Sequence, residues 1–240
     1  MPQPTPFTNP HIVLPVIHVV NTAQAKLNAQ IAYEAGADGV FLINHEDEGG
    51  ERPLTYRHLL DIHQELSQTI PGWWLGVNCL DLPPHETFAH LTPQVAGVWV
   101  DNAYIDERQT AQTAAEQIAH SRQQSQWQGL YFGGVAFKYQ REVADVARAA
   151  QTAVPYIDII TTSGTATGQA AHLHKIQQIR AAIGPHPLAI ASGLTPENIA
   201  AYLPYANYFL VATGISRSFD SFDPARVRAF VQRVRRGVIE

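Results

Sequence analysis

Short apolar runs alternate with longer amphipathic segments along the whole chain. Eight runs of four to nine residues are rich in Val, Ile, Leu, Phe and Ala and show no polar alternation, which is typical of strands buried on both faces. We predict strands at residues 12–20, 39–44, 73–78, 97–100, 130–137, 157–162, 188–191 and 208–212.

Segments with helical periodicity separate these runs. Glycine or proline closes several of them, as at Gly36, Pro71-Gly72 and Pro155. We predict helices at residues 22–35, 54–70, 83–90, 107–123, 141–153, 172–183 and 224–236, with a short helix from residue 195.

Eight strand–helix units in 240 residues predict an α/β fold of the (β/α)₈ barrel type. A doubly wound open sheet is the alternative. We favour the barrel because Ser-Gly and Thr-Gly loops follow the seventh and eighth strands, where such barrels commonly hold a phosphate. Residues 1–10 contain four prolines and are predicted to be a flexible arm, and residues 11–240 a single barrel domain.

The amino-acid composition argues against several classes of protein, namely nucleic-acid-binding, disulfide-bonded and membrane-spanning proteins. The chain is 45% hydrophobic and 15% charged, as in globular proteins, and its net charge of −5 argues against a nucleic-acid partner. Cys79 is the only cysteine, so no internal disulfide can form. No apolar run is long enough to span a membrane, and no basic leader precedes one. These features predict a cytoplasmic protein, and they predict no particular oligomeric state.

The loops that follow the last three strands are rich in glycine and hydroxyl side chains. Glycine lets backbone N–H groups approach a ligand, hydroxyls add donors, and a helix that begins near His172 points its partly positive end the same way. This pattern predicts a phosphate site and a phosphorylated small-molecule ligand. The predicted ligand-binding residues are Ser163, Gly164, Thr165, Thr167, Gly168, Ser192, Gly193, Thr213 and Gly214.

Polar residues at the ends of earlier strands are the catalytic candidates: His45, Asn78, Asp101 and Lys138. Lys138 could neutralise an anion, form an imine or act as an acid, and the alternative is a solvated lysine. Asp101 could be a general base or pair with Lys138, and the alternative is a carboxylate in a turn.

Residues 45–48 read His-Glu-Asp-Glu and could bind Mg²⁺ together with substrate phosphates, although a solvated loop is favoured. We predict no dedicated metal site and no cofactor. His18, in an apolar strand, is interpreted as a core histidine rather than a catalyst.

The last predicted helix has one apolar and one basic face. Its apolar side chains recur at helical spacing and belong to the core. Its five arginines are interpreted as a solvated face, and the alternative is a patch for an anionic lipid surface or an acidic partner, so peripheral membrane association stays open. These arginines are Arg226, Arg228, Arg233, Arg235 and Arg236.

The chain resembles the BtpA family, barrel proteins of the ribulose-phosphate-binding type that have been linked to photosystem I biogenesis. The likeness rests on the motifs at residues 36–39, 75–80, 135–138, 162–168 and 191–198. It implies a barrel, a phosphate site and that biological association, but no defined reaction. The chain departs from the family pattern after the first strand, and at Tyr139, where the family usually has a histidine.

Two functions follow from these observations. The first is an enzyme, or an enzyme-derived protein, that binds or converts a small phosphorylated sugar or nucleotide-like metabolite. The second is a non-catalytic assembly factor for a photosynthetic membrane complex. Chemistry like that of phosphoribosylanthranilate isomerase is less favoured. That chemistry resembles catalysis by an acid–base pair of Cys and Asp, and the only cysteine here follows the third strand.

Overall fold

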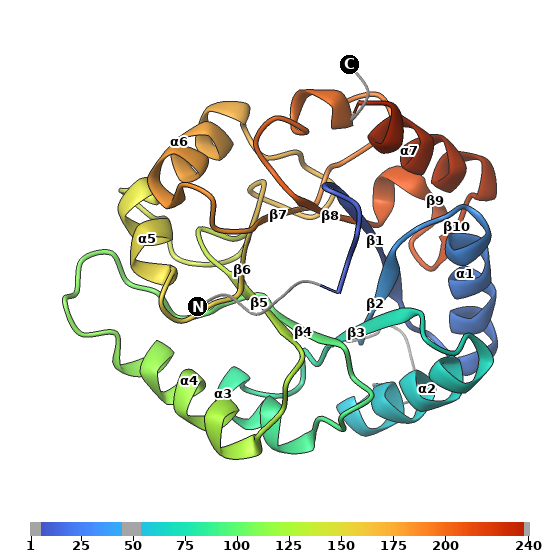
Figure 1. Ribbon diagram of the computed structural model, residues 1–240, viewed down its shortest axis with the longest axis horizontal. Helices are drawn as coiled ribbons and strands as arrows, with labels where there is room; N and C mark the ends of the chain where they lie inside the picture. Colours follow the sequence, from blue (N-terminus) through green and yellow to red (C-terminus); the bar gives the residue numbers. More distant parts are fainter. Residues whose placement is uncertain (1–5, 45–53, 238–240) are drawn as a thin grey trace.

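The computed structural model describes residues 6–44 and 54–237. Eight parallel strands close into a barrel in sequence order, and the pairing of β1 with β8 completes it (Figure 1). The predicted (β/α)₈ barrel is therefore confirmed. The strands are β1 Ile12–His18, β2 Gly39–Ile43, β3 Trp74–Asn78, β4 Gly97–Val100, β5 Leu130–Gly134, β6 Ile159–Ser163, β7 Leu188–Ala191 and β8 Tyr208–Val211.

Helices surround the barrel in the order that the sequence predicts (Figure 1). They are α1 Thr22–Glu34, α2 Tyr56–Thr69, α3 Pro84–Thr87, α4 Thr113–Ser125, α5 Val146–Ala153, α6 Leu173–Ile183 and α7 Pro224–Arg236, with short 3₁₀ turns η1 Phe88–His90, η2 Ile199–Ala201 and η3 Thr213–Ile215. Side-chain caps fix several starts. Asn21, Asp145 and Asp223 each accept a backbone N–H in the first turn of the following helix.

Two helices begin later than predicted, because side chains hold the preceding segments as loops. Residues 107–112 do not join α4, since the buried Gln112 amide donates to the carbonyl oxygens of Asp106 and Gln109. Residues 141–145 do not join α5, since the buried carboxylate of Glu107 accepts hydrogen bonds from the Arg141 guanidinium and from Ala144 N. The strand predicted at 130–137 also ends early, because Ala136 adopts φ 48°.

Aromatic side chains fill the barrel interior. Phe41 packs edge to face against Phe132 at 5.0 Å and against Trp74 at 5.1 Å, and Phe132 does the same against Tyr208 at 5.4 Å. Gly97 makes room for them, because a Cβ there would lie 2.3 Å from the Trp74 ring. The interior is therefore a packed core, so ligands are confined to the barrel ends.

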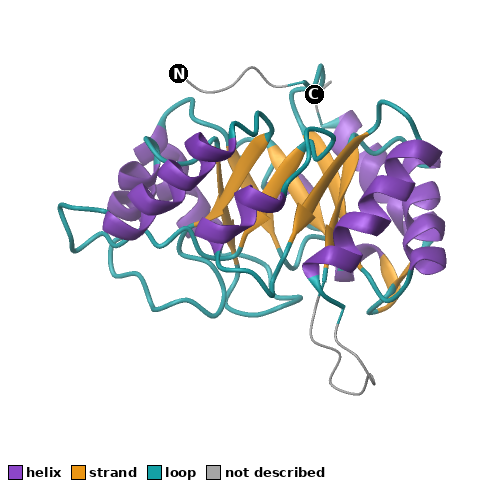
Figure 2. Cartoon of the chain, turned by 90° about the horizontal axis from the view of Figure 1, so that it is seen from below, coloured by secondary structure: helices purple, strands orange, loops and turns teal. Residues whose placement is uncertain are grey.

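Residues 6–10 of the arm and the described loops that follow the strands lie at opposite ends of the barrel (Figure 2). Phe7 packs against the end of the barrel where the strands begin. Its ring centroid lies 5.6 Å from that of Trp74 and 6.0 Å from that of Tyr208, the first residues of β3 and β8. Residues 1–5 lie outside the described part of the chain, and the mobility of the arm stays a prediction.

A small hairpin, which the sequence analysis missed, follows β8. Its strands are β9 Ser216–Ser218 and β10 Ser221–Phe222. The Phe219 ring at its tip stacks on His18 with centroids 4.1 Å apart, and the Phe219 carbonyl oxygen lies 3.0 Å from His18 Nδ1. His18 therefore sits at the rim of the barrel rather than in its core, which corrects the sequence interpretation.

Candidate functional site

The alternation of side chains along each strand decides which residues face the barrel mouth. Trp99 packs inside the barrel, so Asp101, two residues later, lies on the same face. By the same rule Asn78, four residues after the inward-facing Trp74 on β3, also lies on the inner face. Asn78 Nδ2 donates a hydrogen bond of 2.9 Å to Asp101 Oδ1, so two predicted catalytic residues are in direct contact.

Burial raises the pKa of the Asp101 carboxyl above its usual range. The hydrogen bond from Asn78 and the positive charge of Lys138 oppose this shift. Asp101 and Lys138 are thus close enough to interact electrostatically. A carboxyl group that holds its proton more tightly, next to an ammonium group, is suited to moving a proton on a bound ligand.

Lys138 lies at the end of the turn after β5 and is fixed by the loop after β6. Its backbone N–H donates to Ser163 Oγ at 2.8 Å, and its Nζ donates to Thr167 Oγ1 at 3.2 Å. The Tyr139 hydroxyl lies 3.2 Å from the same Thr167 oxygen. The side chains of Lys138 and Tyr139 therefore contact the loop after β6 at Thr167, and Tyr139 is 76% exposed.

The loops after β6, β7 and β8 pack closely against one another, each in contact with its neighbour. A Cβ on Gly193 would lie 2.1 Å from Ala170 N, and a Cβ on Gly214 would lie 1.8 Å from Leu194 O. A Cβ on Gly168 would lie 3.7 Å from Thr213 Oγ1. The structure thus brings the predicted ligand residues of these loops together, and Gly193 and Gly214 are required first for the close packing of one loop on the next.

The hydroxyl groups of these loops differ in their surroundings. Ser163 is fully buried and its Oγ donates to Gly164 O at 2.9 Å, so this side chain holds the loop. Thr165 Oγ1 donates to the side chain of Gln169 at 2.6 Å. Thr167 and Thr213 are exposed, and Ser192 is half-buried with φ 68°. The contact of each of these residues with a ligand stays a prediction.

Other strand-end residues brace the loops. Asn44 Nδ2 donates to Asp81 Oδ1 at 2.6 Å, and Asp81 Oδ2 accepts from Tyr56 N at the start of α2. His45 and the acidic residues after it, including the possible Mg²⁺ ligands, lie outside the described residues.

Three residues at the site were missed from the sequence. Gln140 donates to the carbonyl oxygens of Asp101 and Gly134. Lys175, on α6, donates to the carbonyl oxygens of Ala136 and Ser163. Arg226 Nε donates to Gly214 O at 2.8 Å, which places a guanidinium behind the loop after β8. The scarcity of lysine could have drawn attention to Lys175, whereas Gln140 has no sequence signal.

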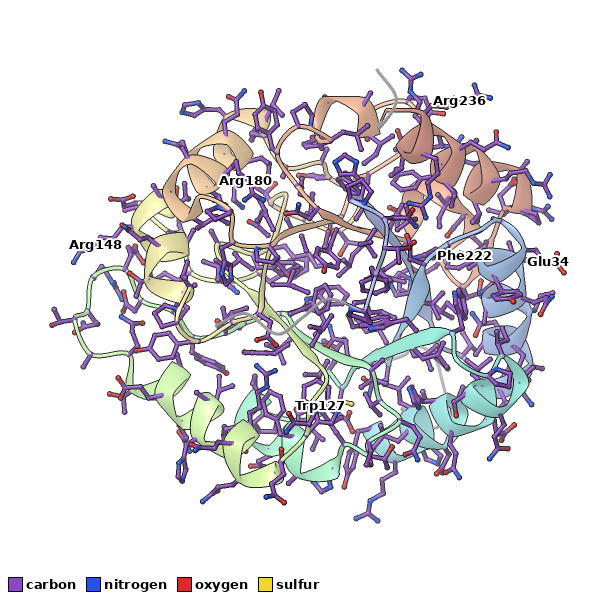
Figure 3. The ribbon with its side chains drawn as sticks, in the orientation of Figure 1. Glu34, Trp127, Arg148, Arg180, Phe222 and Arg236 are labelled. Atoms are coloured by element: carbon purple, nitrogen blue, oxygen red, sulfur yellow. The ribbon has the colours of Figure 1, made fainter. Side chains whose placement is uncertain are left out.

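The arginines of α7 divide into two groups. Arg226 contacts Gly214 and Glu197, and Arg235 is bonded to Asp38 at 2.7 Å. Arg228, Arg233 and Arg236 are exposed, and Figure 3 shows Arg236 on the outer side of the helix. The predicted solvated face therefore consists of three arginines, because the other two fix the fold.

The described residues contain neither a cluster of metal-binding side chains nor a helix that could cross a membrane. Within residues 6–44 and 54–237, no group of three His, Cys, Asp or Glu side chains could hold a metal ion. The helices in the same ranges are all too short or too polar to cross a membrane. Cys79 is buried, which raises its thiol pKa to about 12.

Sequence comparison decides the family. The profile of the BtpA family matches residues 4–236, nearly the whole chain. The chain belongs to the BtpA family. The resemblance inferred from the motifs is thus confirmed. No curated protein matches the sequence significantly.

Solved structures share the fold of this BtpA-family barrel at low sequence identity. Phosphoribosyl anthranilate isomerase from Thermus thermophilus has a TM-score of 0.63 and 14% identity, covering 94% of this chain and 98% of that one. The native KDPGal structure has a TM-score of 0.69 and 14% identity, with full coverage of both chains at 100%. (S)-3-O-geranylgeranylglyceryl phosphate synthase from Thermoplasma acidophilum has a TM-score of 0.64 and 12% identity, covering 95% of this chain and 94% of that one.

The packing of the loops predicts a large stability effect at Gly214. In the BtpA-family barrel, Gly214→Ala is expected to destabilise the fold by about 2–4 kcal/mol, because the new methyl group overlaps a backbone carbonyl. Gly72→Ala is the control. A Cβ at Gly72 would have no atom within 4 Å, so this change tests only the backbone strain of an alanine at φ 79°. Urea unfolding measures both, and an equal loss in the two variants would contradict the close packing.

Burial lowers the pKa of Lys175 to about 8 from its ordinary 10.5. Between these values the unfolded chain binds more protons than the folded chain, so stability relative to Lys175→Met should rise with pH. We expect a gain of up to about 3 kcal/mol across this window. Urea unfolding of both proteins at several pH values measures this gain. A pH-independent difference between their free energies of unfolding would show that the pKa of Lys175 is not shifted.

Proposed function

We propose that this BtpA-family barrel binds a small phosphorylated metabolite, a sugar phosphate or a nucleotide-like compound, at the mouth formed by the strand-end loops. The phosphate lies on the loops after β6, β7 and β8. The observation that carries the proposal is the contact of these three loops, which brings together the segments that carry Thr167, Ser192 and Thr213. Backbone N–H groups and hydroxyls of such loops are suited to phosphate oxygens.

Electrostatics supports an anion at this edge. Lys138 Nζ reaches Thr167, and the Arg226 guanidinium, which is paired with Glu197, lies behind Gly214. Two proteins with the same fold are described with phosphorylated ligands: the geranylgeranylglyceryl phosphate synthase in complex with sn-glycerol-1-phosphate, and a phosphoribosyl anthranilate isomerase in complex with a reduced deoxyribulose 5-phosphate compound. At 12% and 15% identity these likenesses support the proposal by analogy only.

The rest of the ligand lies over Asn78, Asp101 and Lys138. A cleft of about 480 Å³ lies between the loops after β4 and β5, and its lining includes Asn102, next to Asp101 in the chain, and Gln140, but none of these three residues. We propose that Asp101 moves a proton on this part of the ligand while Lys138 stabilises negative charge. Isomerase chemistry that needs an acid–base cysteine is disfavoured, because buried Cys79 stays protonated with its pKa near 12.

Crystals soaked with ribose 5-phosphate, together with calorimetry in solution, test the proposal. We expect electron density for the phosphate between the loops at residues 163–168, 192–193 and 213–214. Glucose 6-phosphate, inorganic phosphate and AMP, assayed in parallel, separate a preference for the sugar from a preference for the base. If none of these probes binds at millimolar concentration, the proposal is wrong.

A second candidate function is a non-catalytic assembly factor for a membrane complex. The observation that favours it is the exposed arginine group on α7, Arg228, Arg233 and Arg236, which could contact an acidic partner or an anionic lipid surface. This alternative predicts that the arginines matter and that the mouth does not. A cytoplasmic location and peripheral membrane association both stay predictions.

A further inference from the structure

The chain has only three lysines, and two of them border the proposed site. Lys26, on α1, forms an ion pair of 2.8 Å with Glu65 on the outer surface. Lys138 and Lys175 take part in none of the ion pairs found among residues 6–44 and 54–237. Two lysines without a bonded carboxylate therefore contact the segments that follow β5 and β6.

Lys175 extends from the first turns of α6 to the ends of these strands. Its Nζ donates to Ser163 O at 2.7 Å and also to Ala136 O. An ammonium group has three donors, and both of these acceptors are neutral carbonyl oxygens. Lys175 thus joins the turn that carries Lys138 to the loop that carries Thr167, while its charge stays uncompensated by any bonded anion.

The turn around Lys138 is strained and needs such support. Ala136 has φ 48° and Tyr139 has φ 61°, so residues with side chains adopt the left-handed region on both sides of Lys138. Polar contacts fix the turn. Ala136 O accepts from Lys175 and from Thr162 Oγ1, Lys138 N donates to Ser163 Oγ, and Phe137 N donates to Gln140.

We propose that Lys175 is a positioning residue of the phosphate site: its ammonium group fixes the left-handed turn that directs Lys138 and adds positive charge behind the loop after β6. The inference deepens the proposed function and rests on it for the ligand. Lys175 itself does not touch the ligand, because it bonds to the backbone between the barrel and α6.

The charge of Lys175 supports this role beyond its hydrogen bonds. A buried cation without a partner is costly, and burial indeed lowers the pKa of Lys175 to about 8. A neutral amide could satisfy two carbonyl oxygens at lower cost. A positive charge at this place is therefore useful mainly if an anion binds nearby, and Thr167, on the loop that Lys175 holds, lies at the proposed phosphate edge.

The first test needs no ligand. Uniform ¹³C labelling makes the Cε signals of the three lysines visible without modifying their amines, and Lys→Arg variants assign the signals. We expect Lys175→Met to shift the Lys138 resonance, because the turn relaxes and a nearby charge is removed. Lys26→Met is the matched control and should leave that resonance unchanged. An unmoved Lys138 signal in folded Lys175→Met would overturn the proposal even if no phosphate ester binds to the wild type.

The second test measures affinity for inorganic phosphate and ribose 5-phosphate by calorimetry. We expect folded Lys175→Met to lose at least tenfold in affinity, and Lys26→Met to match the wild type. If Lys175→Met does not fold, the measurements are made with Ala136→Gly added, because glycine adopts φ 48° without strain.

Restoring an amine at position 175 by chemical modification tests whether the positive charge of Lys175, rather than the loss of its side chain, causes the change in affinity. Lys175→Cys in a Cys79→Ala background, alkylated with bromoethylamine in denaturant and then refolded, regains an ammonium at nearly the same place. The Cys79→Ala change leaves position 175 as the only thiol. Recovery of affinity on alkylation supports the proposal. Affinity within twofold of the wild type in untreated Lys175→Met or Lys175→Cys would overturn it.

Discussion

Thr213→Glu is expected to abolish binding of ribose 5-phosphate and inorganic phosphate. Thr213 is exposed on the loop after β8, and its hydroxyl lies 3.7 Å from the position of a Cβ on Gly168. A glutamate there would place a carboxylate where we propose the phosphate binds. Repulsion between two such charges near a protein surface is worth about 4 kcal/mol, so affinity should fall at least about 100-fold.

Calorimetry measures this effect, and Thr92→Glu is its matched control. Thr92 is also exposed, but it precedes β4 and so lies at the other end of the barrel. The same change in net charge at that place should leave affinity within about twofold, because salt screens charges that are farther apart than about 10 Å. Equal losses in both variants would indicate a general charge effect and contradict the proposed phosphate position.

Replacing both Lys138 and Asp101 is expected to remove the biological activity if the protein is an enzyme. Lys138→Ala and Asp101→Asn should each lower turnover about 10²–10⁴-fold, with smaller effects on ligand affinity. Asp101→Asn keeps an oxygen that can accept the hydrogen bond from Asn78, so the fold should persist. Complementation of a deletion strain by the double variant is the measurement.

The matched experiment reverses the charge of α7. Glutamates at Arg228, Arg233 and Arg236 change only exposed positions, whereas Arg226 and Arg235 must stay because they bond to Gly214 and Asp38. The catalytic proposal expects this triple variant to complement fully. Full rescue by the Lys138→Ala, Asp101→Asn double variant, with failure of the arginine variant, would instead favour the assembly factor.

The arrangement of strands and helices was largely predictable from the sequence. The eight apolar runs correspond to β1–β8, because parallel strands covered on both faces need continuous apolar segments. Element boundaries failed where single side chains decide them. Gln112 holds residues 107–112 out of α4, and Glu107 holds residues 141–145 out of α5. A local sequence pattern does not contain the partner that each of these side chains finds.

The position of the candidate site was predictable, but its internal connections were not. The sequence alone placed Asn78, Asp101, Lys138 and the small-residue loops at strand ends, since the period of two along a strand and the βα order fix these places. Only the tertiary structure paired Asn78 with Asp101, placed Lys175 and Arg226 behind the loops, and packed Gly193 and Gly214 against neighbouring backbones. These contacts join residues at least 12 positions apart in the sequence, so they depend on how strands, loops and helices pack, which no local pattern encodes.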